Sequence, residues 1–382
     1  MKKTIRIFNL LIVMLLIASL CRGAGSEASS SQRDVKGAVS GKRVETAKAS
    51  SAKRTSSKET GFTINTLILT VNSSSPVYWP EFLFWLNYIE KYYKSYHNLD
   101  KITDWETTQN GVGLKEFFLS NAVGYACKDR ALEAKAKELG IGLSVSDLAE
   151  IEQLRKKNIQ IYGSESEYLH IVRSMYVTED VFNYLSRMDY LGNHLFEYLY
   201  GEKGEKCTDA EVSAYVKQQG YTCVKYIFLS NTDSAGKDQG EEKRVKNYKL
   251  MEGMLGRLKS SGTPQALFDS LMKENSSDRD ILNYPDGRLI PTGAMSKEFE
   301  GACMKLKEKE YSGIVTTDEG YYIIMRMPIS PDMTADSGGN TLRYRTAYDY
   351  LFKNQIEDIA AKMKVNYEAA YYKIDLEGLG NN

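Results

Sequence analysis

Histidine is scarce in this sequence, and so is any excess of charge of one sign. Only three of the 382 residues are histidine, and none of these, His97, His170 or His194, lies at metal-ligand spacing from a cysteine. Basic and acidic side chains both number 50, so the formal net charge is zero. Phosphate binding needs clustered lysine and arginine. The composition therefore argues against a metal site and against nucleic acid as a partner, and no cofactor is expected.

Cysteine is also rare, and no Cys-x-x-Cys pair occurs. After the N-terminal region the cysteines are Cys127, Cys207, Cys223 and Cys303. They could form two bridges in an exported chain, but their wide spacing is not typical of a disulfide framework. We expect buried free thiols instead.

The longest apolar run lies at the N-terminus. Basic residues precede a stretch from Ile7 to Leu20 that is short for a membrane span and typical of a secretory signal. We interpret residues 1–24 as a signal peptide, with cleavage near Gly23 to Gly25. Cys21 leaves lipid acylation open as an alternative, although Leu20 stands where a small residue usually precedes an acylated cysteine.

Residues 25–60 contain almost no large apolar side chain. Serine, alanine, lysine and glycine predominate, and such a composition cannot offset the entropy lost on ordering. We predict a disordered tether. A signal and a tether together indicate an exported protein of the cell envelope, in the periplasm or on the outer face of the cytoplasmic membrane, with the N-terminus as its candidate anchor.

Residues 61–219 have a mostly helical pattern. A strand is expected over 62–71, followed by a helix that begins at Pro80. Further helices are expected over 112–139, 146–161, 164–175 and 179–200. Thr208 and Glu211 form a capping-box pattern at the start of another short helix. We interpret this region as a helical domain of chaperone type.

Aromatic side chains are crowded near the first of these helices. They are Tyr78, Trp79, Phe82, Phe84, Trp85, Tyr88, Tyr92 and Tyr93. Eight rings so close in sequence cannot all face one core, so some must be at least half exposed. Core packing accounts for part of the set, and a cradle for unfolded segments is the functional alternative for the rest.

From residue 220 to 328 the periodicity changes. Strands are expected at 221–230 and on either side of the turn at Asp318, and helices over 241–260, from Pro264 and from Ser296. This order is typical of a compact α+β domain. A long amphipathic helix and a strand within 340–376 cannot bury their apolar faces alone, so we expect them to pack on the helical domain. The predicted fold class is α+β, mostly helical, with an inserted antiparallel-sheet domain.

The segment 221–328 resembles the parvulin, or PpiC-type, rotamase family. Its motif begins with the strand VKYIFLS and continues through the helix and loop LFDSLMKENSSD. The stretch GAMSKEFEGACMKLKEKEYSGIV then matches almost register for register. The matching residues there are Gly293, Met295, Phe299, Ala302, Leu306, Ser312 and Val315, with Lys309 where glycine is customary. The resemblance extends more weakly over 62–376 to exported foldases of the PrsA and SurA type.

The same resemblance implies a site, with one departure. Family members usually carry a histidine in the first strand and another in the last, beside an acidic or thiol residue. The matching positions here are Tyr226 and Tyr322, and Asp286 aligns loosely with an acidic family position. Met295, Phe299 and Leu289 are the candidates for an apolar cup that binds proline. Tyr226 and Tyr322 as sheet-packing residues, and Asp286 as a turn residue, are the structural alternatives.

Proline isomerisation breaks no covalent bond, so losing the histidines does not by itself abolish it. Tyrosine nevertheless cannot reproduce both nitrogens of an imidazole pair. We therefore expect a foldase that binds unfolded or nascent exported polypeptides, with weak or absent prolyl isomerase activity. Two alternatives remain: a fully active isomerase with a histidine-free pocket, and an envelope structural or adhesion protein built on a retired rotamase scaffold.

Overall fold

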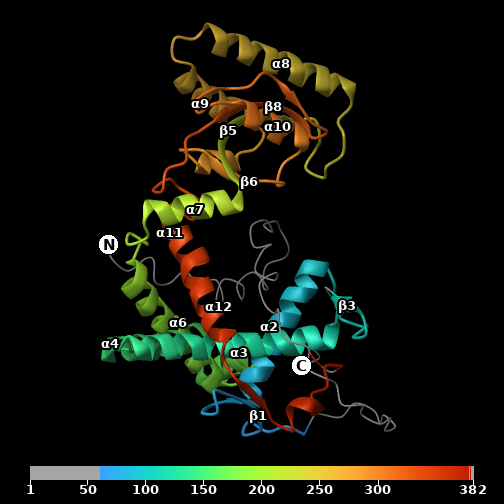
Figure 1. Ribbon diagram of the computed structural model, residues 1–382. Helices are drawn as coiled ribbons and strands as arrows, with labels where there is room; N and C mark the ends of the chain where they lie inside the picture. Colours follow the sequence, from blue (N-terminus) through green and yellow to red (C-terminus); the bar gives the residue numbers. More distant parts are fainter. Residues whose placement is uncertain (1–60, 110, 378, 380–382) are drawn as a thin grey trace. The chain divides into compact units, whose positions relative to one another are not determined.

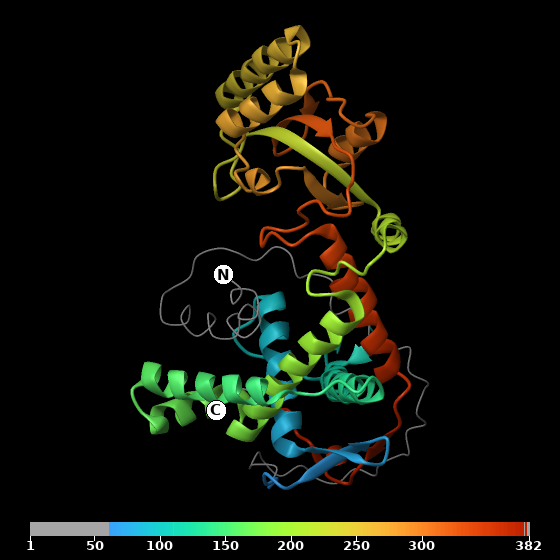
Figure 2. The same cartoon turned by 90° about the vertical axis from the view of Figure 1, so that its left-hand side faces the viewer.

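The computed structural model describes residues 61–109, 111–377 and 379. The predicted signal peptide, the tether and Cys21 lie outside these residues. By its internal contacts the chain divides into two units, the first including residues up to Leu195 and from Gln355 onward, the second running from Phe196 to Asn354. The two units are drawn together in Figures 1 and 2 and are described separately here. No helix among the described residues is long and apolar enough to cross a bilayer.

The first unit combines a small antiparallel sheet with a set of helices. In the sheet, β1 (Leu67–Val71) is central, between β2 (Ser75–Tyr78) and β9 (Val365–Tyr367). The segment near the C-terminus therefore pairs with the first strand, as Leu69 opposite Tyr367 illustrates. The helices are α2 (Trp79–His97), α3 (Leu114–Glu138), α4 (Val145–Tyr162), α5 (Glu165–Tyr176) and α6 (Glu179–Tyr200). Short elements complete the unit, namely β3 (Thr108–Gln109), β4 (Val112–Gly113) and η3 (Tyr371–Lys373).

Local sequence signals account for the ends of these helices. Pro80 lies in the first turn of α2, where its missing N–H costs nothing. α4 begins at Val145, one residue before the expected start at 146, and Ser144 and Asp147 form a capping box there. α4 and α5 run side by side as a hairpin (Figure 2), with Gly163 in the left-handed conformation between them.

The aromatic residues near α2 are divided between core and surface. Phe82 is fully buried, whereas Tyr92 is 50% exposed and Tyr78 is 44% exposed. Trp85 stacks on Tyr125 of α3, with ring centroids 4.7 Å apart. The prediction that some of these rings are at least half exposed is confirmed, and the cradle remains a hypothesis.

The second unit is built on a four-stranded antiparallel sheet (Figure 1). Its strand order is β6 (Arg288–Pro291), β5 (Tyr221–Ser230), β8 (Gly320–Arg326) and β7 (Val315–Thr316). The helices packed on the sheet are α8 (Glu241–Ser260), α9 (Pro264–Asn275) and α10 (Lys297–Lys305), and the 3-10 turn η1 (Asp280–Asn283) precedes β6. The fold class is thus α+β, as predicted. The sequence pattern did not reveal β6 or η1, because neither is longer than four residues.

The second unit extends beyond the predicted domain of 220–328. It also includes α7 (Asp209–Gln219), α11 (Leu342–Arg345) and the π-helical segment η2 (Thr346–Phe352), after which α12 (Lys353–Ala360) continues the helix. α7 contacts α11 and η2. Arg343 holds them together, because its guanidinium donates to the Cys207 carbonyl at 2.6 Å and pairs with Asp209 at 2.7 Å. The long C-terminal helix was predicted to pack on the helical domain of 61–219, and its first half contacts α7, which lies within that range.

The four cysteines of the described chain are buried free thiols. Burial raises the pKa of Cys303 to about 11 and that of Cys223 to about 12. Thiols with such values carry little thiolate at neutral pH, so they behave as small apolar core residues.

Candidate functional site

The strand register of β5 and β8 sorts their side chains onto two faces. Side chains alternate along a strand, and residues directly opposite in an antiparallel pair share a face. Phe228 lies opposite Tyr322, and Tyr226 lies opposite Ile324, so Tyr226 and Tyr322 point to the same side. Ile227 and Ile323 point to the other side. The sheet therefore has one face that carries both tyrosines, which we call the tyrosine face, and an opposite face that α8 and α9 cover.

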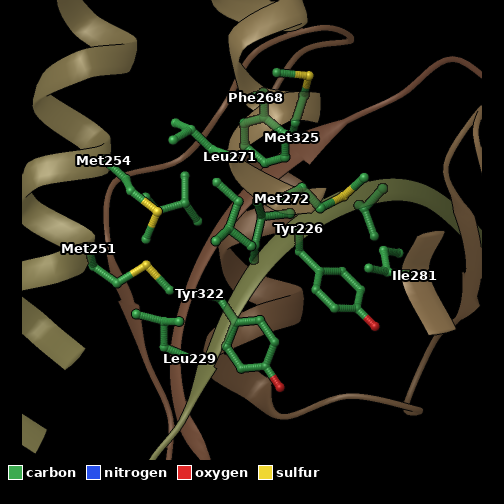
Figure 3. Packing of buried hydrophobic residues seen from close by; sticks show 14 of the residues in the cluster. Tyr226, Leu229, Met251, Met254, Phe268, Leu271, Met272, Ile281, Tyr322 and Met325 are labelled. Atoms are coloured by element: carbon green, nitrogen blue, oxygen red, sulfur yellow. The ribbon is translucent and has the colours of Figure 1, made fainter. Parts of the chain in front are cut away.

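Figure 3 shows the two tyrosines with their hydroxyls directed away from Met251 and Met254 of α8. Their ring centroids lie 5.7 Å apart, and the planes are nearly perpendicular. Phe299 of α10 closes the group, with its centroid 5.7 Å from that of Tyr226 and 5.1 Å from that of Tyr322. All three side chains are at most 4% exposed. The structure thus brings together three of the predicted site residues in one aromatic cluster.

The hydroxyl of Tyr226 is tied to a carboxylate that the sequence analysis did not assign to the site. It donates to Asp278 Oδ2 at 2.5 Å. Arg288, on the tyrosine face of β6, donates from Nη1 to the same hydroxyl at 3.4 Å and lies 3.6 Å from Asp278. Asp280 is a second acidic partner of Arg288, at 3.4 Å. The polar part of the site is therefore a Tyr–Asp–Arg network at the edge of an aromatic cluster.

Burial controls the protonation of both tyrosines. It raises the pKa of Tyr226 well above its usual value, and the hydrogen bond to the Asp278 carboxylate adds to the effect. Burial also raises the pKa of Tyr322, and the nearby Glu319 carboxylate contributes. The Tyr322 hydroxyl donates to Glu319 Oε2 over a long 3.4 Å. Both phenols are therefore neutral at physiological pH and act as hydrogen-bond donors rather than as bases.

A pocket opens between α10 and the edge of the sheet on the tyrosine face. Val224 and Ile290 form its floor, and Phe299, Cys303 and Met304 of α10 line one side. Met304 is 71% exposed, so an apolar side chain marks the rim. The wall also includes the polar side chains of Thr222, Thr292 and Glu300, and the volume of about 30 Å³ holds only one or two water molecules.

Met295 is held at the start of α10 by a specific turn. Glu300 accepts two backbone hydrogen bonds, from Gly293 N at 2.7 Å and from Met295 N at 3.2 Å. Ser296 caps the helix by accepting from Phe299 N. Met295 is half-buried and packs against the same core as Phe299. These two predicted cup residues are therefore brought together.

Leu289 and Asp286 do not join this group. Leu289 lies opposite Cys223 in the register, which puts it on the face turned away from Tyr226 and Tyr322. Asp286 is an exposed turn residue, and its carbonyl oxygen accepts the Cys223 thiol at 3.7 Å. Its contact is thus also on the opposite face. The acidic residue that meets the tyrosines is Asp278.

Of the two missed residues, Asp278 and Arg288, only Asp278 had a signal in the sequence. Asp278 is part of the quoted loop motif SSD, directly after the helix that packs on β5. Arg288 was hidden in a loop-like stretch, because its position on a strand became visible only with the pairing of β6 to β5. Strand parity alone would then have separated Arg288 from Leu289.

Lys309 is one departure from the family pattern. It stands where glycine is customary, and its φ of 67° lies in the left-handed region that glycine adopts without cost. Its N–H donates to the Arg326 carbonyl at 2.7 Å, so the conformation is needed for the chain to meet the end of β8. The lysine therefore keeps the backbone of the motif at some energetic cost.

Comparison with known families agrees with this architecture. Residues 227–327 match the PPIC-type PPIase domain of the rotamase family. The predicted resemblance is confirmed for this part of the chain, which is a PPIC-type domain. Tyr226 lies one residue before the matched stretch, and Tyr322 lies within it. No match was found among curated proteins.

Solved structures give weaker similarities over most of the chain. PrsA from Bacillus subtilis is 17% identical, over 74% of this chain and 99% of that one, with a TM-score of 0.28. The foldase protein PrsA from Lactococcus lactis is 13% identical, over 81% and 97%, with a TM-score of 0.30. A SurA-like chaperone from Campylobacter jejuni is 12% identical, over 80% and 100%, with a TM-score of 0.25. Similarities at this level do not assign a function.

Proposed function

We propose that the protein is a foldase that binds unfolded polypeptides, and that its PPIC-type domain isomerises X-Pro bonds weakly. The observation that carries the proposal is the aromatic cluster of Tyr226, Tyr322 and Phe299 beside an apolar pocket, within a domain of the rotamase family. The pocket, of about 30 Å³, would take one edge of the proline ring against Phe299, and the Tyr226 hydroxyl lies at the edge of the cluster where an imide would rest.

The chemistry available to this site is desolvation and hydrogen bonding. Rotation about an X-Pro bond has a barrier of about 18–20 kcal/mol because of amide resonance. An apolar cup lowers it by disfavouring the polar planar imide, and a donor to the imide nitrogen stabilises the twisted form. The Tyr226 hydroxyl already donates to Asp278 at 2.5 Å, so this hydroxyl is a poor donor to a substrate. This is the reason for expecting weak activity.

The proposal is tested by measuring isomerisation of a set of X-Pro tetrapeptides with the full chain. Wild-type protein should accelerate isomerisation slightly, and Met295→Ala should remove the effect because Met295 forms part of the cup. Leu250→Ser is the matched control and should change the rate little, because Leu250 is 48% exposed on α8 and outside the pocket wall. Tyr226→His with Tyr322→His tests whether imidazoles raise it. Complete inactivity of folded wild-type protein would remove the isomerase part of the proposal.

Binding of unfolded clients is the second part and has its own test. The half-exposed rings of the helical unit, such as Tyr92 and Tyr96, are the candidate surface. Suppression of aggregation of a denatured client should persist in Met295→Ala and fall when these two tyrosines are replaced by serine. Binding of one folded partner, with no effect on denatured clients, would favour the alternative of an envelope structural or adhesion protein.

Export is proposed from the sequence of residues 1–60. Together with the signal, the lysine-rich tether fits a protein that works outside the cytoplasmic membrane, with or without an acyl anchor on Cys21. N-terminal sequencing and mass determination of the mature protein distinguish cleavage near Gly23 to Gly25 from acylation at Cys21.

A further inference from the structure

A second pocket lies within the first unit, where α4, α5 and the start of α6 meet. Aromatic and aliphatic side chains make up most of its wall. Tyr162 comes from α4, Val172, Met175 and Tyr176 from α5, and Phe182 from α6. Tyr176 also stacks on Phe84 of α2, with ring centroids 5.4 Å apart and an angle of 8° between the planes. Tyr176 thus links the wall of the pocket to α2.

Asn158 is a buried polar group in this wall. Asn158 is 3% exposed, and its side-chain Nδ2 has no hydrogen-bond partner among the described residues. Tyr168 is also in the wall, and burial together with the nearby Glu179 carboxylate raises its pKa to about 12. Buried polar groups are nearly always paired, because an unpaired one loses its hydration without compensation. A ligand with an oxygen acceptor would supply the missing partner of Asn158.

The link between α5 and α6 is strained beside the same pocket. Val177 has φ 68° and ψ −48°, and Thr178 N donates to Tyr176 O at 2.7 Å. This is a γ-turn of the strained type, and its central residue is β-branched. Strained turns persist only where their surroundings impose them, and they gather at switch segments. Tyr176 and Phe182 flank the turn, so a movement about Val177 would change the width of the pocket.

We propose that this pocket binds an apolar side chain of an extended polypeptide, and that Asn158 Nδ2 donates to a main-chain carbonyl next to that side chain. The apolar wall with its unpaired amide donor matches such a ligand. The pocket has a volume of about 10 Å³, room for about one water molecule. An apolar side chain can enter only if the pocket opens. The strained turn at Val177 is the hinge about which α5 moves to admit the side chain. The inference rests on the proposed binding of unfolded clients and identifies one place where it occurs.

The test uses the full chain and two labelled peptides. One is a 12-residue peptide of serine, threonine and glycine with a single phenylalanine, and the other has serine in place of the phenylalanine. Fluorescence anisotropy should show that only the first peptide binds. Asn158→Leu should weaken its binding about tenfold while raising the melting temperature of the first unit, because an unpaired buried amide is removed. A purely structural role for Asn158 would change the melting temperature alone.

Two further variants test the pocket and the hinge. Val172→Trp fills the pocket and should abolish peptide binding, with circular dichroism used to show that the helices remain folded. Val177→Gly relieves strain in the closed state, so closure is favoured and peptide affinity should fall about tenfold. Ile161→Ser is the matched control, because Ile161 is on α4 but 64% exposed and outside the pocket wall.

Each outcome decides between the pocket and the proposed function. Unchanged peptide binding in Asn158→Leu and Val172→Trp, or equal binding of the two peptides, overturns the pocket inference. The pocket inference is also overturned if the wild-type protein suppresses aggregation of a denatured client but does not bind the phenylalanine peptide. In that case the proposed function stands. Peptide binding that responds to the variants, without aggregation suppression or X-Pro isomerisation, supports the pocket and overturns the proposed function.

Discussion

Replacing Tyr226 by phenylalanine should weaken the sheet of the second unit without disturbing its packing. The ring stays between Phe299 and Tyr322, and only the hydroxyl that donates to Asp278 at 2.5 Å is lost. A hydrogen bond to a charged group contributes about 1.5–3 kcal/mol. The Asp278 side chain is 26% exposed and also accepts from Asp280 N at 3.0 Å, so water replaces part of the loss. We expect a destabilisation of about 1–2 kcal/mol.

The tryptophans make it possible to follow the two units separately. Trp79, Trp85 and Trp105 all belong to the first unit. Hydrogen exchange of the β5 and β8 amides reports on the second unit, while tryptophan emission during unfolding serves as an internal control. Tyr226→Phe should accelerate exchange in these strands and leave the emission transition unchanged.

A double-mutant cycle with Asp278→Asn isolates the bond itself. The two residues should show a coupling free energy of about 1 kcal/mol, since each single change removes the same interaction. Effects that add within about 0.3 kcal/mol would refute the reasoning that this short hydrogen bond stabilises the site. The same variants in the X-Pro assay show whether freeing Asp278 or Tyr226 changes catalysis.

Three other changes have defined outcomes. Lys309→Gly should stabilise the second unit by about 0.5–1 kcal/mol in urea unfolding, because glycine tolerates φ 67°, whereas Lys309→Ala should give no such gain. Gly320→Ala should destabilise the second unit by roughly 3–5 kcal/mol, since a Cβ would lie 2.2 Å from the Leu229 carbonyl oxygen. Normal hydrogen exchange in β5 of this variant would contradict the prediction. Burial alone would raise the pKa of Asp147, but hydrogen bonds from Ser144 and His194 outweigh it and lower the pKa. The resulting stabilisation is present above about pH 4 and lost as pH falls through the folded-state pKa, so Asp147→Asn should destabilise the first unit at pH 7 and flatten its pH dependence below pH 4.

Most of the helices and the long strands could be predicted because their signals are local. The pattern over 241–260 and the strand over 221–230 agree with α8 and β5 at both ends. Thr208 and Glu211 form the capping box that their spacing indicated. In each case the information lies within one helical turn or one strand, so neighbouring residues suffice. By contrast, the long helix expected within 340–376 contains the π-helical segment η2, which no local pattern signals.

The candidate site shows the same division. Similarity to a known motif was enough to select Tyr226, Tyr322, Met295 and Phe299, which the structure gathers around the tyrosine face. The motif could not separate them from Leu289, because the face on which a residue of β6 lies depends on its register with β5. A shift of one residue would exchange Leu289 and Arg288 between the faces.

The α+β class, the positions of the long elements and the similarity to rotamase domains follow from consecutive residues, since periodicity, caps and motifs are local properties. Folding brings Asp278, 52 residues from Tyr226 in the chain, to the tyrosine hydroxyl, and it buries Asn158 Nδ2 with no hydrogen-bond partner among the described residues. Such contacts depend on how separate strands and helices pack. Their energies come from burial and pairing between distant segments, which no single stretch of sequence contains.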